Sequence, residues 1–89
     1  MPTVIAHHEV RDTQHWLSSP KREEVLAPLG VSNIRTFVSQ QNPQRVAVLM
    51  DVADLDAMME ALANPSPEFA EAMEYDGVLP ETMSILVQS

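Results

Sequence analysis

The sequence predicts an α+β protein whose strands and helices follow the order βαββαβ, and the stretch from Gln44 to Ala63 carries most of this prediction. Residues 45–52 alternate, with one face wholly apolar and the other nearly so, as in a strand that is covered on both sides. An apolar stripe at helical spacing follows, made of Leu55, Met58, Met59 and Leu62. Asp54 is placed to cap this helix, which we expect to pack on the strand before it.

The N-terminus predicts a strand that places two adjacent histidines on opposite faces. One face would carry Val4, Ala6, His8 and Val10. The other face would carry Thr3, Ile5, His7 and Glu9. The two histidines therefore cannot hold one metal ion together, and Asp12 or Thr13 can cap the helix that comes next.

That helix is predicted to be broken. Leu17 and Leu26 lie nine residues apart, which puts them about 180° out of phase in a straight α-helix. Because one straight helix could not bury both, we expect a break at residues 18–20. Ser19 would act as the cap of the second piece, and Pro20 would occupy its first position.

The next segment predicts a turn and a second strand. Gly30 suits the left-handed residue that ends a helix, and residues 33–40 have the pattern of a strand. Residues 41–43 form a short connection to residues 45–52, because proline fixes φ and asparagine tolerates unusual backbone angles. We therefore expect these two strands to be antiparallel neighbours.

The C-terminal part predicts one more helix and a last strand. Ser66 can cap the helix, with Pro67 at its first position. Gly77 would end the helix in the same way as the earlier glycine. We expect a turn that ends at Pro80 and a final strand over residues 83–87.

This order is the pattern of a ferredoxin-like fold, in one domain over residues 1–89, with the helices on one face of a four-stranded antiparallel sheet. The other face would carry one large apolar residue on each strand, namely Ile5, Phe37, Leu49 and Leu86. Burying such side chains is worth about 1.5–3 kcal/mol each. We therefore expect a homodimer that closes sheet to sheet into a barrel, with larger homo-oligomers left open.

The charge distribution restricts the partners. The net charge is −8, and residues 46–89 hold nine acids and no Lys or Arg. This argues against nucleic acid and membranes as partners. No apolar segment approaches the roughly 18 residues of a spanning helix, and no signal peptide is recognisable, so we expect a soluble, cytoplasmic protein. With no cysteine and only scattered acids, we expect neither a metal site nor a cofactor.

At this level the chain resembles the dimeric α/β-barrel superfamily, which includes antibiotic-biosynthesis monooxygenase-like proteins, stress-responsive barrels and small polyketide cyclases. The likeness covers nearly the whole chain and rests on the following segments: His8-x-Val10-x-Asp12, Trp16, Gly30-Val31, VADLDAMMEAL at residues 52–62 and EAMEYDGV at residues 71–78. It implies a small hydrophobic ligand in each half of the barrel. Some members oxidise that ligand without metal or flavin, and others cyclise it with His and Tyr acid–base groups. Stand-ins here for the residues around the cavity of such oxygenases are Trp16, Asn33, Arg35 and Tyr75.

The candidate site residues lie mainly on the barrel side of the sheet. His7 is the acid–base candidate, because an imidazole titrates near neutral pH. Arg35 could hold a carboxylate or phenolate, or instead pair with Asp51 on the neighbouring strand. The expected ligand contacts are Ile5, Trp16, Asn33, Phe37, Leu49 and Leu86. His8 is expected to be buried and hydrogen-bonded, Trp16 could equally close the core, and the core-filling methionines would be Met58, Met59 and Met73.

Three functions are compatible with these observations. The first is a homodimer that binds a small, partly apolar organic molecule, either between sheet and helices or inside the barrel. The second is a cofactor-independent monooxygenase or polyketide-type cyclase, with His7 moving a proton, Arg35 and Asn33 holding an oxyanion and Trp16 as a wall. The third is a purely architectural or partner-binding module. An enclosed pocket lined by His7, Phe37 and Leu49 would favour the first two.

Overall fold

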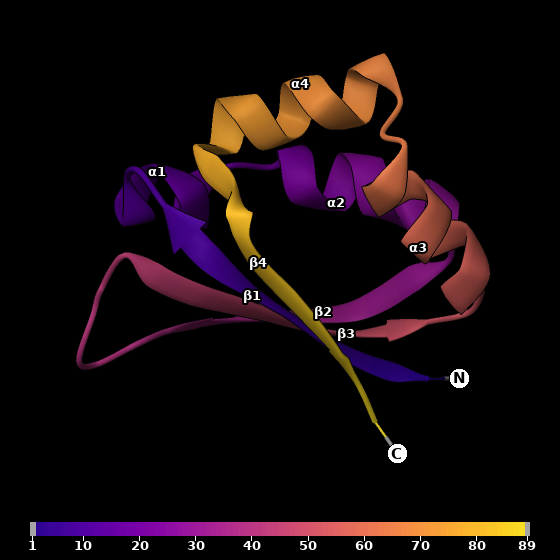
Figure 1. Cartoon of the computed structure of the whole chain (residues 1–89), viewed down its shortest axis with the longest axis horizontal. Coiled ribbons are helices and arrows are strands. Elements are labelled where there is room, and N and C mark those ends of the chain that lie inside the picture. Colours follow the sequence, from indigo (N-terminus) through magenta and orange to yellow (C-terminus); the bar gives the residue numbers. More distant parts are fainter. Residues whose placement is uncertain (1, 89) are drawn as a thin grey trace.

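A computed structural model describes residues 2–88 and confirms the predicted ferredoxin-like architecture. Figure 1 shows a twisted four-stranded sheet with all helices on one side of it. The strands are β1 (Thr3–Val10), β2 (Val31–Val38), β3 (Arg45–Val52) and β4 (Val78–Val87), in the spatial order β2-β3-β1-β4 with antiparallel pairing throughout. The helices are α1 (Thr13–Ser18), α2 (Lys21–Leu26), the 3₁₀ turn η1 (Ala27–Leu29), α3 (Leu55–Ala63) and α4 (Pro67–Asp76). Among residues 2–88, no helix is long and apolar enough to cross a membrane.

The helix caps explain where the chain changes direction. The Asp12 side chain accepts a hydrogen bond from the His15 backbone N–H, and Asp54 and Ser66 cap α3 and α4 in the same way. The predicted break between α1 and α2 is present, and Ser19 Oγ accepts from the Lys21 N–H at 3.2 Å. The prediction that Ser19 caps α2 with Pro20 at its first position is wrong by one residue: Pro20 is the N-cap of α2 and makes no side-chain cap hydrogen bond, and Ser19 is the residue that ends α1.

Two glycines end helical segments in the left-handed conformation, as predicted. Gly30 has φ 77° and Gly77 has φ 73°. A Cβ at Gly30 would lie 3.0 Å from the Cβ of Ala53, so there is also too little space for a side chain at this position. These turns direct the chain from the helical layer back into β2 and β4.

Two strands differ from the predicted boundaries. β2 starts at Val31 instead of residue 33, because Val31 pairs with Val52 directly after the Gly30 turn. β4 starts at Val78 instead of residue 83 and runs through Pro80. A proline is tolerated there because β4 is an edge strand, and its pairing with β1 shifts register between His7 and Glu9.

The core lies between the sheet and the helices. The fully buried residues with the largest side chains are Trp16, Met50, Met58, Val4, Val10, Val46 and Val52. The prediction for Met59 was wrong, since this side chain is 42% exposed. It lies about 100° around α3 from the buried Met58. Leu55, Met58 and Leu62 provide the inward stripe without it.

The open face of the sheet has the predicted apolar residues in two neighbouring rows. The register places Arg35, Leu49, Ile5 and Leu86 in one row, and Phe37, Ala47, His7 and Ser84 in the next. In the single chain Phe37 is 51% exposed, and Ile5 and Leu86 are exposed as well. The side of the sheet away from the helices thus exposes apolar side chains together with Arg35, His7 and Ser84.

Candidate ligand-binding site

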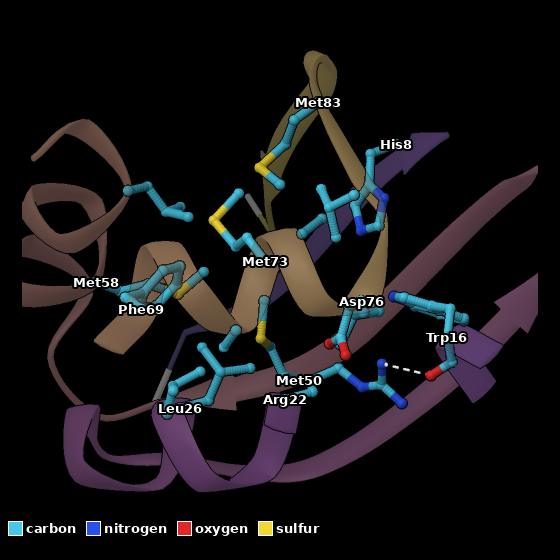
Figure 2. Close-up of a pocket in the computed structure, with 16 residues that line it drawn as sticks. His8, Trp16, Arg22, Leu26, Met50, Met58, Phe69, Met73, Asp76 and Met83 are labelled. Carbon is cyan, nitrogen blue, oxygen red and sulfur yellow. Dashed lines mark hydrogen bonds between the residues drawn. The ribbon is translucent and has the colours of Figure 1, made fainter. Parts of the chain in front are cut away.

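A cavity of about 70 Å³ lies between the sheet and the helical layer. Side chains from β1, β3, β4 and all four α-helices surround it (Figure 2). Four of its lining residues are methionines: Met50, Met58, Met73 and Met83. Methionine is flexible and polarisable, so such a wall can adjust to ligands of different shape. In Figure 2 Met58 and Phe69 lie toward one end, and His8, Trp16, Arg22 and Asp76 gather at the other.

His8 contributes a neutral imidazole to this polar end. Its side chain is only 4% exposed, and its ring meets the Trp16 ring edge to face at 5.9 Å. Nδ1 lies 3.4 Å from the Glu9 backbone oxygen, and because a carbonyl only accepts, the proton is on Nδ1 and the lone pair on Nε2. Burial lowers the pKa of His8, and the charges of Arg22 and Arg45 act in the same direction. The imidazole is therefore a hydrogen-bond acceptor and a potential base at neutral pH.

Arg22 contributes a cation that is fixed by Trp16. The guanidinium carbon lies 4.4 Å from the centre of the Trp16 ring, and one terminal nitrogen donates to the Trp16 carbonyl at 3.4 Å. Burial lowers the pKa of Arg22, while the nearby Asp76 carboxylate partly opposes this shift. The Nε atom is buried, and no acceptor in residues 2–88 bonds it.

Asp76 contributes a buried carboxylate. It is the last residue of α4 and only 5% exposed, and its Oδ1 atom has no hydrogen-bond partner in the described part of the chain. Between residues 2 and 88, Asp76 and Arg22 also form no ion pair with each other. A carboxylate is disfavoured at the negative end of a helix dipole, and an unpaired buried charge is costly. Fold stability alone therefore does not explain this residue.

Two side chains lie between the cavity and a groove on the surface. Val25 and Phe69 line both the cavity and a surface groove between α2 and the α3–α4 segment. The groove has a volume of about 580 Å³, and its acidic residues are Glu24, Glu60 and Glu68. A movement of Phe69 or Val25 would connect the cavity to this acidic groove.

The structure divides the residues that sequence reasoning assigned to one site. Trp16 lines the helix-side cavity. The other candidates lie on the open face of the sheet or at its edge: Ile5, His7, Asn33, Arg35, Phe37, Leu49 and Leu86. His7 and Phe37 line a shallow hollow there, whose lining does not include Leu49. The single chain thus places Trp16 and these residues on opposite sides of the sheet.

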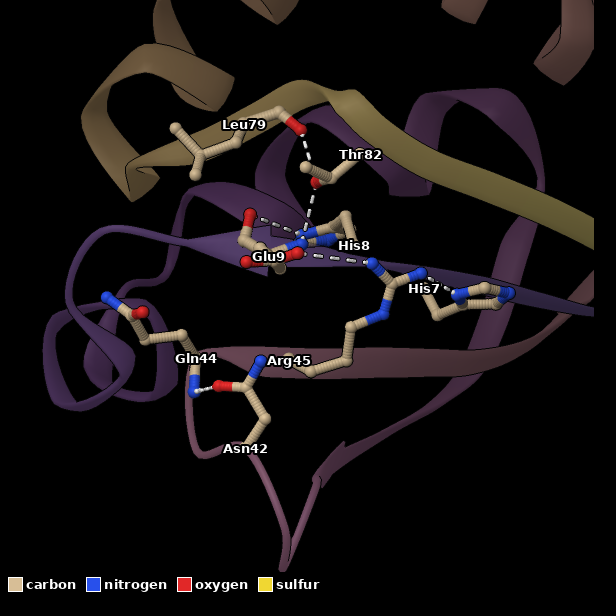
Figure 3. Close-up of polar contacts among 8 residues, drawn as sticks. All are labelled: His7, His8, Glu9, Asn42, Gln44, Arg45, Leu79 and Thr82. Carbon is tan, nitrogen blue, oxygen red and sulfur yellow. Dashed lines mark hydrogen bonds and ion pairs between the residues drawn. The ribbon is translucent and has the colours of Figure 1, made fainter.

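His7 and Asp51 on the open face already have hydrogen-bond partners. Arg45 donates to Nδ1 of His7 and also pairs with Glu9 at 3.6 Å (Figure 3). The predicted alternative of an Arg35–Asp51 pair is wrong, because no ion pair joins these two residues in the described part of the chain. Asp51 accepts from Thr3 at 3.0 Å and from Asn33 at 3.3 Å instead. Asn33 lies within the register shift of β2 and has a left-handed backbone with φ 54°.

Sequence reasoning missed Arg22 and Asp76. The one available signal was the position of Asp76, an acid at the end of a helix and directly before the glycine that closes it. For Arg22 no signal existed, since it lies among charged residues of α2 and only the fold shows that it turns inward. Across residues 2–88, no cluster of His, Asp and Glu could hold a metal ion.

Fold and cavity together define a ferredoxin-like α+β protein with a pocket between its sheet and its helices. Several solved structures share this fold. An antibiotic biosynthesis monooxygenase has 16% identity and a TM-score of 0.61, with 100% of this chain and 97% of the other covered. A candidate antibiotic biosynthesis monooxygenase from Bordetella bronchiseptica has 16% identity and a TM-score of 0.69, covering 99% and 94%. A conserved protein from Methanosarcina mazei Go1 has 18% identity and a TM-score of 0.65, covering 98% and 89%.

The similarity is one of structure. No protein-family model and no curated protein matches the chain. At these identities the likeness establishes the fold, and it confirms the architecture of antibiotic-biosynthesis monooxygenase-like proteins that the sequence resemblance implied.

Proposed function

We propose that the protein binds a small, partly apolar organic molecule in the helix-side cavity. The apolar part would lie against the methionines and Phe69, and a polar group would meet His8, Arg22 and Asp76. One observation carries this proposal: Asp76 is buried with an unpaired oxygen beside an arginine whose Nε is also unpaired. Buried polar atoms almost always have partners, and a polar ligand group that enters the cavity would supply one for both atoms.

The experiment that tests the proposal is extraction of the purified protein followed by mass spectrometry, combined with titration of the recovered compound. Trp16 is the only tryptophan and lines the cavity, so its fluorescence reports binding there. We expect saturable quenching in the wild type and a loss of affinity in Asp76→Leu. Unchanged affinity in a folded Asp76→Leu variant would refute the cavity as the binding site.

We further propose a homodimer in which the open faces of two sheets cover each other. The exposed apolar residues Ile5, Phe37 and Leu86 support this assembly, since covering the apolar area that each still exposes would stabilise the dimer. The space between the sheets would then contain His7 and Arg35. It is a second, less supported place for a ligand, because the His7 imidazole already accepts from Arg45.

A cofactor-independent monooxygenase or cyclase is the second candidate function. The neutral His8 beside the Arg22 cation supports it, because a base next to a fixed positive charge can remove a proton and hold the resulting anion. In a monooxygenase reaction, O₂ would be the oxidant. Oxygen uptake with a screened quinol should then depend on His8, and a His8→Gln variant with full turnover would refute this candidate.

A further inference from the structure

The polar end of the cavity combines two opposite formal charges with an imidazole. Arg22 carries +1 and Asp76 carries −1, and His8 is neutral because of its burial. Around this end the walls are largely apolar, so an added charge would be poorly solvated. A ligand with a formal charge would therefore disturb a balanced pair.

The hydrogen-bonding groups of this pair are complementary to a neutral group. Arg22 Nε–H is a donor without an acceptor, and Asp76 Oδ1 is an acceptor without a donor, as judged over residues 2–88. Since the two side chains are not bonded to each other in this part of the chain, each remains free for a ligand. An alcohol or phenol hydroxyl can accept from the first and donate to the second at once.

The acidic groove beside the cavity also disfavours charged ligands. Glu24, Glu60 and Glu68 lie along the groove that borders the cavity at Val25 and Phe69. Their negative charges disfavour the approach of anions. A cation that passed this groove would then be repelled by the Arg22 guanidinium inside the cavity.

We infer that the cavity selects small uncharged hydroxyl compounds, and that Arg22 and Asp76 form its specificity-determining pair. This inference rests on the proposed ligand-binding function and names the class of ligand. The hydroxyl oxygen accepts from Arg22 and its proton is donated to Asp76, while the hydrocarbon part lies against the methionines.

Four matched five-membered-ring compounds test this inference: cyclopentanol, methylcyclopentane, cyclopentanecarboxylate and cyclopentylammonium. None absorbs where Trp16 is excited, so its fluorescence measures binding, with calorimetry as a second readout. We expect cyclopentanol to bind the wild type about tenfold or more tightly than either ion, as two hydrogen bonds to charged groups suggest. Equal affinity for an ion and the alcohol would overturn the inference.

Charge-changing variants make the test sharper. Asp76→Asn gives the polar end a charge of +1, so we expect cyclopentanecarboxylate to gain about tenfold in affinity and cyclopentanol to lose it. Arg22→Gln should shift the preference toward cyclopentylammonium instead. Glu74→Gln is the matched control, since this acid lies on the same helix and is exposed. If Glu74→Gln changes the preferences as much as Asp76→Asn, the effect is overall charge and the inference is wrong.

The outcomes separate this inference from the proposed function. If methylcyclopentane and cyclopentanol bind equally in the wild type and in all variants, the cavity binds ligands without the proposed selection. If none of the four compounds binds, both the inference and the cavity as a binding site fail. A variant that does not fold is recognised by its NMR spectrum, and the wild-type ranking then decides alone.

Discussion

Arg22 and Trp16 are joined twice, by the guanidinium over the indole ring at 4.4 Å and by a hydrogen bond to the Trp16 carbonyl at 3.4 Å. The two residues are six positions apart, which in a straight helix would place them about 120° apart around the axis. The break between α1 and α2 makes this contact possible. The Ser19–Pro20 turn thus connects a local feature of the sequence to the polar end of the cavity.

The coupling between Arg22 and Asp76 can be measured by a double-mutant cycle. Arg22→Met and Asp76→Leu should each lower the free energy of unfolding by about 1–3 kcal/mol, because each leaves the partner's charge buried and uncompensated. The double variant should recover most of this loss, since it removes both opposite charges and replaces them with apolar side chains. Urea unfolding measures all four proteins.

The control for this cycle is the exposed pair Arg11 and Glu74, which lie 3.5 Å apart. The corresponding cycle there should give a coupling of at most about 0.5 kcal/mol. Strictly additive losses at Arg22 and Asp76 would show that the two charges do not interact.

The stability of the protein should fall as the pH drops below about 6.5 because of His8. Burial lowers the pKa of His8 in the folded protein, so the unfolded chain binds more protons in this range. The resulting loss is at most about 1.4 kcal/mol per pH unit. Unfolding measured from pH 7.5 to 5.0 should show a smaller slope in His8→Gln. The same slope in His8→Gln and wild type would contradict this assignment, and His7→Gln serves as the matched control.

The open face of the sheet predicts a dimer that single charges can break. We expect sedimentation at micromolar concentration to show a particle of twice the chain mass, and Phe37→Asp to give monomers, because a carboxylate would be buried between the sheets. Met59→Asp, an exposed apolar position on α3, should leave the dimer intact. A wild type that sediments only as a single chain would refute the barrel.

Phe69 should control how fast a ligand leaves the cavity. Phe69→Leu places a smaller side chain between the cavity and the acidic groove, so the dissociation rate of the ligand should rise several-fold. The free energy of unfolding should fall by about 1 kcal/mol. Stopped-flow fluorescence of Trp16 measures the rate. Phe37→Leu, on the other face of the sheet, should leave it unchanged, and a similar acceleration in both variants would argue against the proposed route.

The sequence was sufficient for the fold because the signals for each element are local. The alternation in β3, the Asp54 cap and the two left-handed glycines each specify their own turn or strand. The starts of β2 and β4 could not be predicted, since they depend on which residues the neighbouring strands pair with. Met59 was misassigned because helical spacing does not tell how wide the contact of α3 with the sheet is.

The site was harder to predict because its parts come from different elements. His8, Arg22 and Asp76 are brought together by β1, α2 and α4, and no short segment contains two of them. His7 attracted attention because it shares the barrel side with Ile5 and Phe37. Which side of the sheet encloses a cavity is visible only once the helices are packed.

The position of a bound ligand tests the central claim most directly. Isotope-filtered NMR on uniformly ¹³C-labelled protein would detect contacts between unlabelled cyclopentanol and nearby side chains. We predict contacts to Met50, Met58, Met73 and Met83 and to the Trp16 indole. Contacts to Ile5, Phe37 and Leu86 instead would place the ligand between the two sheets and contradict the helix-side site.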